Sequence, residues 1–163
     1  MKMNKAPRSV WTNPIHFLAF GFGAGASPIA PGTCGTLIAI PFYLLIQQLP
    51  LLLYLFVVII TAIVGIWLCD VAERDTGIPD NPGIVWDEIV GYFITMIAAP
   101  TGWMWVVLGF VLFRIFDVWK PWPIRWLDKN LKGGLGIMVD DWLAAGYAWI
   151  SLQIIVMVVQ RFA

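Results

Sequence analysis

Residues 51–69 read LLLYLFVVIITAIVGIWLC and contain no charged side chain. An uncharged apolar run of about 18 residues or more is long enough to cross the hydrocarbon core of a bilayer as a helix. A second such run, WLAAGYAWISLQIIVMVV, occupies residues 142–159. Two membrane-spanning helices are therefore predicted, and the rest of the chain is interpreted around them.

The composition supports a membrane protein. Of the 163 residues, 60% are hydrophobic and 12% are charged, whereas about 25% of the residues in an ordinary soluble domain are charged. No linker or low-complexity segment divides the chain, so a single domain over residues 1–163 is expected. The net charge is zero, and we expect no nucleic acid partner because there is no overall positive field to attract one.

Two further pairs of apolar segments indicate tight helical hairpins. Residues 36–49 form an apolar segment that Pro50 ends, directly before the run 51–69. Residues 89–99 and 103–113 form a second pair around a Pro-Thr-Gly turn. The predicted fold is therefore all-α: a multi-helix integral membrane protein, built as a compact helical bundle with two tight hairpins.

The hairpins also predict which polar segments share one side of the membrane. Each hairpin returns the chain to the side it left, so the N-terminus and the segments 70–88 and 114–141 are expected together. The N-terminus carries Lys2, Lys5 and Arg8, and segment 114–141 is also rich in Lys and Arg. An excess of these residues marks the cytoplasmic side. We therefore expect a multi-pass protein of the bacterial inner membrane with its charged surface in the cytoplasm.

Two motifs place acidic side chains on apolar helices. In VWDEIVG, residues 85–91, Asp87 and Glu88 head an apolar helix, where the helix dipole alone would favour them. In FRIFDVWKPWPIRWLD, residues 113–128, Arg114, Asp117 and Lys120 form one stripe at 100° per residue. That stripe could be only an ion-pair ladder. Charges inside a membrane protein are costly, however, which makes them functional candidates.

A third motif, KGGLGIMVDDWLAAG, occupies residues 132–146. Asp140 is able to cap a helix that begins near Asp141 or Trp142. Capping does not explain both aspartates, because adjacent carboxylates at low dielectric repel each other unless a cation lies nearby. The preceding glycines allow the backbone to approach a ligand closely. The candidate substrate-binding residues in this motif are Lys132, Gly133 and Gly134.

Together the motifs provide carboxylates from three separate segments on one face. Oxygen-rich sites suit Mg²⁺, which binds through a few carboxylates plus substrate phosphate, and Arg114 and Lys120 are natural phosphate partners. The candidate metal ligands are Asp87, Glu88, Asp117, Asp140 and Asp141.

The glycine-rich run GFGAGASPIAPGTCGTLIAIP, residues 21–41, ends where a helix begins. N–H groups at a helix N-terminus bind phosphate readily, so Thr33, Gly35 and Thr36 are candidate phosphate donors; a plain membrane-entry loop is the alternative. The chain has a single histidine and neither an aspartyl nor a cysteine phosphatase motif. This leaves metal-activated water as the attacking group on phosphorus.

The motifs GFGAGASPIAPGTCGT, VWDEIVG, FRIFDVWKPWPIRWLD and GGLGIMVDDWLAAG occur in this order between residues 20 and 146. Together they resemble the phosphatidylglycerophosphatase A family. The resemblance implies an all-helical, Mg²⁺-dependent lipid phosphatase of the bacterial inner membrane. Its substrate would be phosphatidylglycerophosphate in the membrane, hydrolysed to phosphatidylglycerol and phosphate. In such an enzyme Arg114, Lys120 and Asp141 are the expected catalytic residues.

Three other functions remain as alternatives at this point. A small cation transporter would also use intramembrane carboxylates, but the chain has no inverted repeats. A phosphatidyltransferase would carry an Asp-Gly-x2-Ala-Arg run, which is not found. A non-catalytic assembly subunit would use buried ion pairs only for helix packing.

Overall fold

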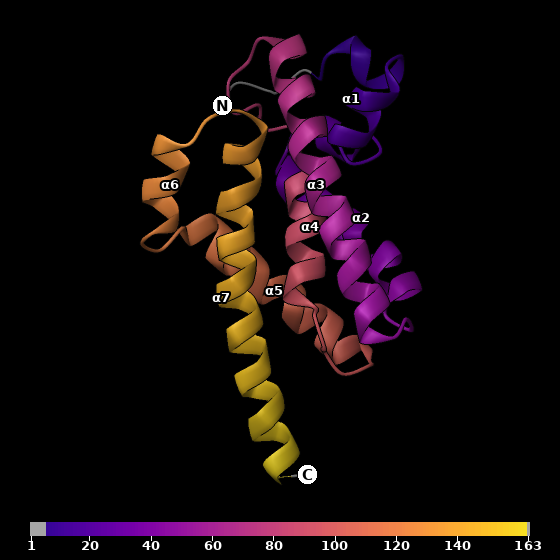
Figure 1. Cartoon of the computed structure of the whole chain (residues 1–163), viewed down its shortest axis with the longest axis vertical. Coiled ribbons are helices and arrows are strands. Elements are labelled where there is room, and N and C mark those ends of the chain that lie inside the picture. Colours follow the sequence, from indigo (N-terminus) through magenta and orange to yellow (C-terminus); the bar gives the residue numbers. More distant parts are fainter. Residues whose placement is uncertain (1–5, 163) are drawn as a thin grey trace.

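The structure, a computed structural model, describes residues 6–162, so Lys2 and Lys5 lie outside the described residues. Within this range the chain forms seven α-helices, two short 3-10 helices and no β-strand (Figure 1). The predicted all-α class is confirmed. The elements are η1 (Arg8–Trp11), α1 (Pro14–Ala19), η2 (Ala24–Ala26), α2 (Pro31–Ile46), α3 (Leu51–Thr76), α4 (Trp86–Thr95), α5 (Trp103–Trp119), α6 (Ile124–Asn130) and α7 (Gly133–Phe162).

Both predicted spans lie within the two longest helices. Helices α3 and α7 are long and apolar enough to cross a membrane. Helix α3 begins directly after Pro50 and ends at Thr76, followed by the C-cap Gly77, whose φ of 64° is the left-handed conformation that favours glycine. Helix α7 runs past the other helices to the C-terminal end of the molecule (Figure 1).

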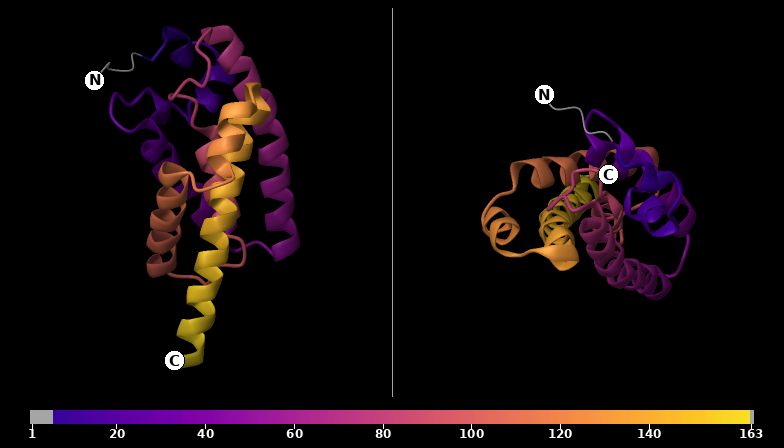
Figure 2. Two further views of the ribbon diagram at one scale, coloured as in Figure 1. Left: turned by 90° about the vertical axis from the view of Figure 1, so that its left-hand side faces the viewer. Right: turned by 90° about the horizontal axis from the view of Figure 1, so that it is seen from above.

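Of the two predicted hairpins, α4–α5 is present as a packed pair, whereas α2 and α3 follow each other closely in the chain but pack mainly on other helices and not as a tight hairpin. Helix α2 is followed by α3 after a short turn, and α4 is followed by α5. The short helix α4 is the centre of the bundle, because α2, α3, α5 and α7 all contact it. Its Val90 and Tyr92 are completely buried, and the Tyr92 hydroxyl donates to the Val106 carbonyl at 3.0 Å. Helix α7 in turn contacts α3, α4 and α5 (Figure 2).

The start of α7 differs from the sequence prediction. The helix begins at Gly133, so Asp140 lies about two turns inside it and cannot act as its N-cap. The glycines at the start of α7 are part of the helix. They have no side chain, so α7 can lie very close to α3 at this point. A Cβ on Gly134 would collide with the Ile66 carbonyl oxygen of α3 and lie 2.6 Å from the Asp70 backbone nitrogen. The glycine run is therefore part of the α3–α7 contact.

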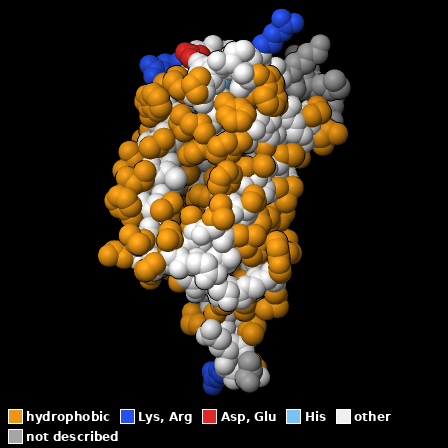
Figure 3. All heavy atoms as spheres, turned by 90° about the vertical axis from the view of Figure 1, so that its right-hand side faces the viewer, with side chains coloured by type: hydrophobic (Ala, Val, Ile, Leu, Met, Phe, Trp, Pro, Cys, Tyr) orange, Lys and Arg blue, Asp and Glu red, His pale blue; other side chains and the backbone are white. Residues whose placement is uncertain are grey.

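Large apolar side chains cover the outside of the long helices. Leu45 of α2, Leu52 of α3, Val107 of α5 and Met157 of α7 are all exposed, and Figure 3 shows hydrophobic atoms over most of one face. Among the described residues, charged side chains occur near the N-terminus, in segments 70–88 and 114–141, and at Arg161 in the last turn of α7. An apolar body with charges gathered elsewhere is typical of a surface that contacts lipid.

Candidate active site

Carboxylates from α4 and α7 meet inside the bundle. Asp87 and Glu88 lie in the first turn of α4, and Asp141 reaches them from α7, which packs directly against α4. One oxygen from each of these three residues lies within 4.8 Å of the other two. Their side chains are largely buried, and Asp87 Oδ1, Glu88 Oε2 and Asp141 Oδ2 have no hydrogen-bond partner among the described residues. We call these three residues the carboxylate cluster.

The surroundings of the cluster disfavour negative charge on it. Burial raises the pKa of Asp87 well above its usual range, and the neighbouring Glu88 charge raises it further. Burial also raises the pKa of Glu88, to about 8, with the Asp141 charge as the next cause. Three carboxylates this close hold a proton or require a cation. The oxygens without partners are therefore suitable ligands for a divalent metal ion.

Arg114 of α5 lies beside the carboxylate cluster. Its Nη1 atom is 2.5 Å from Asp117 Oδ2 on the same helix and 4.0 Å from Glu88 Oε1. Arg114 and Asp117 form part of the polar stripe that the sequence predicted, and both side chains are mostly buried; the third member, Lys120, lies just past the end of the helix. A guanidinium held in this position is able to bind the oxygens of a phosphate through two parallel hydrogen bonds.

Lys120 provides a second positive charge at the end of α5. Its backbone is left-handed, with a φ of 45°, and it caps the helix before Pro121. Its Nζ donates to Asp140 Oδ2 at 2.6 Å and to Asp128 Oδ1 at 2.9 Å. Asp140 is thus paired with a lysine, whereas Asp141 belongs to the carboxylate cluster. Of the predicted metal ligands, Asp117 contacts Arg114 of α5 and Asp140 contacts Lys120 just after that helix.

A cavity of about 370 Å³ connects these groups. Its wall includes Gly32, from the first turn of α2, and a Cβ on Gly32 would collide with Glu88 Oε1 and lie 3.3 Å from Arg114 Nη1. The sequence did not predict a role for Gly32, although it belongs to the PGTCGT run. The charged and amide residues that line the cavity are Asp80, Asn81, Asp87, Glu88, Arg114, Asp117, Lys120, Asp140 and Asp141.

The predicted phosphate donors of this run, Thr33, Gly35 and Thr36, do not line the cavity. Gly35 allows α2 to pack against Val85, whose Cβ would be 2.6 Å from a Cβ at this position. The Thr36 hydroxyl is buried and donates to the Gly32 carbonyl of its own helix at 3.0 Å. Thr33 likewise lies outside the residues that line the cavity.

The predicted substrate-binding residues at the start of α7 also lie outside this cavity. The Gly134 backbone N–H donates to Asp70 Oδ1 at 3.4 Å, on the α3 side. Lys132 and Gly133 line a small crevice that also includes Asp128 and Asp140. They therefore approach the far side of the Lys120 ion pairs and do not reach the carboxylate cluster.

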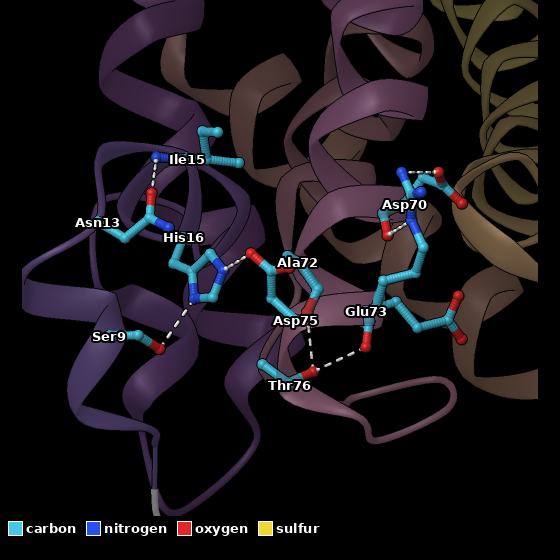
Figure 4. Close-up of polar contacts among 10 residues, drawn as sticks. Ser9, Asn13, Ile15, His16, Asp70, Ala72, Glu73, Asp75 and Thr76 are labelled. Carbon is cyan, nitrogen blue, oxygen red and sulfur yellow. Dashed lines mark hydrogen bonds and ion pairs between the residues drawn. The ribbon is translucent and has the colours of Figure 1, made fainter.

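A separate polar group connects α1 to the end of α3 (Figure 4). His16 is buried, with Nδ1 2.8 Å from the Ser9 hydroxyl and Nε2 3.0 Å from Asp75 Oδ2. None of these three residues lines the cavity. We interpret this group as a contact that holds the N-terminal helices against α3.

A family profile and two similar proteins carry the same family description. The profile of a family described as Phosphatidylglycerophosphatase A matches residues 17–156, a range that includes the whole cavity. A Phosphatidylglycerophosphatase A of Escherichia coli (strain K12) is 54% identical over 134 residues, which cover 82% of this chain and 78% of that protein. One of Haemophilus influenzae is 46% identical over 138 residues, covering 83% and 85%.

A relative from Bacteroides thetaiotaomicron, provisionally named as a phosphatidylinositol-3-phosphatase, is 40% identical over 147 residues, covering 82% of this chain and 88% of that protein. No solved structure matches the chain. The cation transporter that the sequence left open has no support from these comparisons.

Proposed function

The chain belongs to the phosphatidylglycerophosphatase A family, and we propose that it hydrolyses phosphatidylglycerophosphate to phosphatidylglycerol and inorganic phosphate. The observation that carries the proposal is the carboxylate cluster beside Arg114 in one cavity, in which one buried oxygen of each carboxylate has no hydrogen-bond partner within residues 6–162. A cation on the carboxylates and a guanidinium beside them would together bind a phosphomonoester dianion.

The donor set fits a magnesium ion. Asp87, Glu88 and Asp141 present only carboxylate oxygens, which are the ligands that Mg²⁺ prefers, and Mg²⁺ commonly adds substrate phosphate to a few carboxylates. When bound, the ion would lower the pKa of a coordinated water and offset negative charge on the phosphoryl oxygens. Asp117 and Asp140 remain candidate ligands, although each is paired with a cation in or just after α5.

The protein's own groups have separate roles in this mechanism. Arg114 orients the phosphoryl group and stabilises the charge that spreads over its oxygens in the transition state. Lys120, held by Asp128 and Asp140, adds positive charge at the cavity edge. The oxygen of water attacks phosphorus while the bond from phosphorus to the glycerol oxygen breaks. A carboxylate, for which we propose Asp141, accepts the water proton, and this proton is then passed to the glycerol oxygen, which leaves as a hydroxyl.

We further propose a membrane arrangement for the enzyme. Helices α3 and α7 cross the inner membrane of a bacterium, with α2, α4 and α5 completing a multi-pass bundle. The segments 70–88 and 114–141 then lie at the cytoplasmic side, because they contain most of the Lys and Arg residues. The exposed apolar side chains contact lipid, and the substrate keeps its acyl chains in the bilayer while its phosphate enters the cavity.

Phosphate release from purified enzyme in detergent micelles tests the proposal. We expect release from phosphatidylglycerophosphate in Mg²⁺, loss of release in EDTA and recovery when Mg²⁺ is restored. Mg²⁺ should also raise the unfolding temperature of the wild-type protein, since a ligand that binds only the folded state stabilises it. Undiminished phosphate release in EDTA would contradict the metal site.

The Asp141→Asn variant tests the assignment of that residue. It should fold and lose phosphate release about 100-fold or more, because a metal ligand and proton acceptor is removed. The matched control is Asp70→Asn, since Asp70 lies on α3 outside the cavity. We expect the control to retain activity. A folded Asp141→Asn enzyme with wild-type turnover would exclude Asp141 from the site.

A further inference from the structure

A groove between the end of α5 and helix α6 lies next to the cavity. It has a volume of about 490 Å³. Its lining combines three tryptophans with three cations: Trp119, Trp122, Trp126, Lys120, Arg125 and Lys129. No carboxylate lines it in the part of the chain that the structure describes. We call it the α5–α6 groove.

Two of the three cations of the groove, Arg125 and Lys129, are available to a ligand, whereas Lys120 is paired with Asp128 and Asp140. Arg125 and Lys129 are exposed and lie one turn apart on α6. Within residues 6–162, neither is within ion-pair distance of a carboxylate; Arg125 donates only to the Trp119 carbonyl, at 3.2 Å. The surface therefore has positive charge that the described chain does not neutralise. An anion is the complementary ligand.

The tryptophans indicate where that anion comes from. Trp122 is 81% exposed, and Trp119 and Trp126 are also largely exposed. Exposed tryptophans beside Lys and Arg are typical of the headgroup level of a bilayer, where an indole ring contacts both lipid chains and polar groups. The complementary anion is therefore expected on a lipid.

Lys120 connects the groove to the cavity, because it lines both. The proposed substrate has two phosphates joined by a short glycerol: a terminal monoester and a diester that carries the lipid. We propose that the α5–α6 groove binds the phosphodiester of the substrate while the monoester occupies the cavity. This inference rests on the proposed function and gives Arg125 and Lys129 a role in substrate specificity, since a lipid with only a phosphomonoester would not use them.

The product of the reaction provides a direct test, since phosphatidylglycerol keeps the diester and lacks the monoester. We compare wild-type enzyme with the Arg125→Gln/Lys129→Gln double variant in micelles of neutral detergent with Mg²⁺. The variant should raise the KM for phosphatidylglycerophosphate and the inhibition constant for phosphatidylglycerol about tenfold each. Its kcat and its inhibition constant for inorganic phosphate, which reports on the cavity, should stay within about twofold.

The matched control removes two positive charges elsewhere. Arg8 and Arg74 are exposed and lie outside the groove, so Arg8→Gln/Arg74→Gln should leave all four constants unchanged. The inference is overturned if the groove variant behaves like wild type. It is also overturned if the control shows the same losses, because binding would then depend on the overall surface charge and not on the groove. A wild-type enzyme that releases no phosphate from phosphatidylglycerophosphate would instead refute the proposed function, and this inference with it.

Discussion

Asp140 and Asp141 are adjacent in the sequence and have different partners in the structure. Successive residues of an α-helix point about 100° apart, so neighbours in α7 face different helices. Asp141 faces α4 and joins Asp87 and Glu88, whereas Asp140 accepts from Lys120 at the end of α5. The sequence predicted that this pair requires positive charge. A lysine provides it for Asp140, and we propose a metal ion for Asp141.

Gly32, which lines the same cavity and faces Glu88, offers a test of the position of the Glu88 carboxylate. In Gly32→Ala, the added methyl group collides with Glu88 Oε1 and displaces that carboxylate. We expect the Mg²⁺ concentration for half-maximal phosphate release to rise about tenfold or more. A loss of this size is typical when the groups that hold a metal ligand in position are changed.

The control for Gly32→Ala is Gly146→Ala in α7, where the new Cβ would meet no other part of the described chain within 4 Å beyond the adjacent backbone of its own helix. This control should retain activity and gain about 0.5–1 kcal/mol in the free energy of unfolding, because alanine favours a helix interior over glycine. If the Gly32→Ala variant and the wild type depend on Mg²⁺ equally, the prediction that the added methyl group displaces the Glu88 carboxylate is wrong.

The pKa of Glu88 predicts how the metal-free protein responds to pH. The pKa rises from 4.5 to about 8 on folding, so the folded state binds this proton more tightly than the unfolded state. The stability contributed by the group is complete below pH 4.5 and is lost as the pH rises through about 8. In EDTA, the unfolding temperature should therefore fall across this window. Glu88→Gln, which has no proton to lose, should show a smaller fall; identical pH profiles would contradict the assignment.

At the scale of elements, the contact between α3 and α7 positions Asp141. Gly134 lies against the backbone of α3 at Ile66 and Asp70, and Asp141 follows two turns later on the same helix. The sequence pattern predicted both apolar spans because a long uncharged run has few other stable conformations. It placed the start of α7 too late, because a glycine run resembles a loop until a partner helix requires close approach.

Gly134→Ala should therefore separate the two helices. Backbone atoms cannot move aside as a flexible side chain can, so we expect a cost of about 1–3 kcal/mol in the free energy of unfolding. Activity should also fall, since Asp141 would shift relative to α4. Chemical unfolding and phosphate release measure the two effects, with Gly146→Ala again as the control. An unchanged unfolding free energy would show that the helices are not held this closely.

At the scale of the whole molecule, the exposed apolar surface and the separated charges predict an orientation. The start of α7 is expected in the cytoplasm and its end, at Arg161, on the other side of the membrane. Single cysteines are placed at Arg74 and Gln160, in a background where Cys34 and Cys69 are alanine. In Escherichia coli spheroplasts, a membrane-impermeant maleimide should label Gln160→Cys directly and Arg74→Cys only after lysis. The reverse pattern would place the cavity outside the cytoplasm.

The sequence by itself determined the two long apolar runs within α3 and α7, the apolar surface and the gathering of acidic residues in segments 70–88 and 114–141, because these depend on local periodicity and composition. Only the tertiary structure decided that Asp87, Glu88 and Asp141 form the cluster, that Lys120 pairs with Asp140 and Asp128, and that Gly32 completes the wall. Spacing along one helix fixes how its side chains are rotated relative to one another. It does not fix the register between helices, which is set by close contacts such as that of Gly134 with α3.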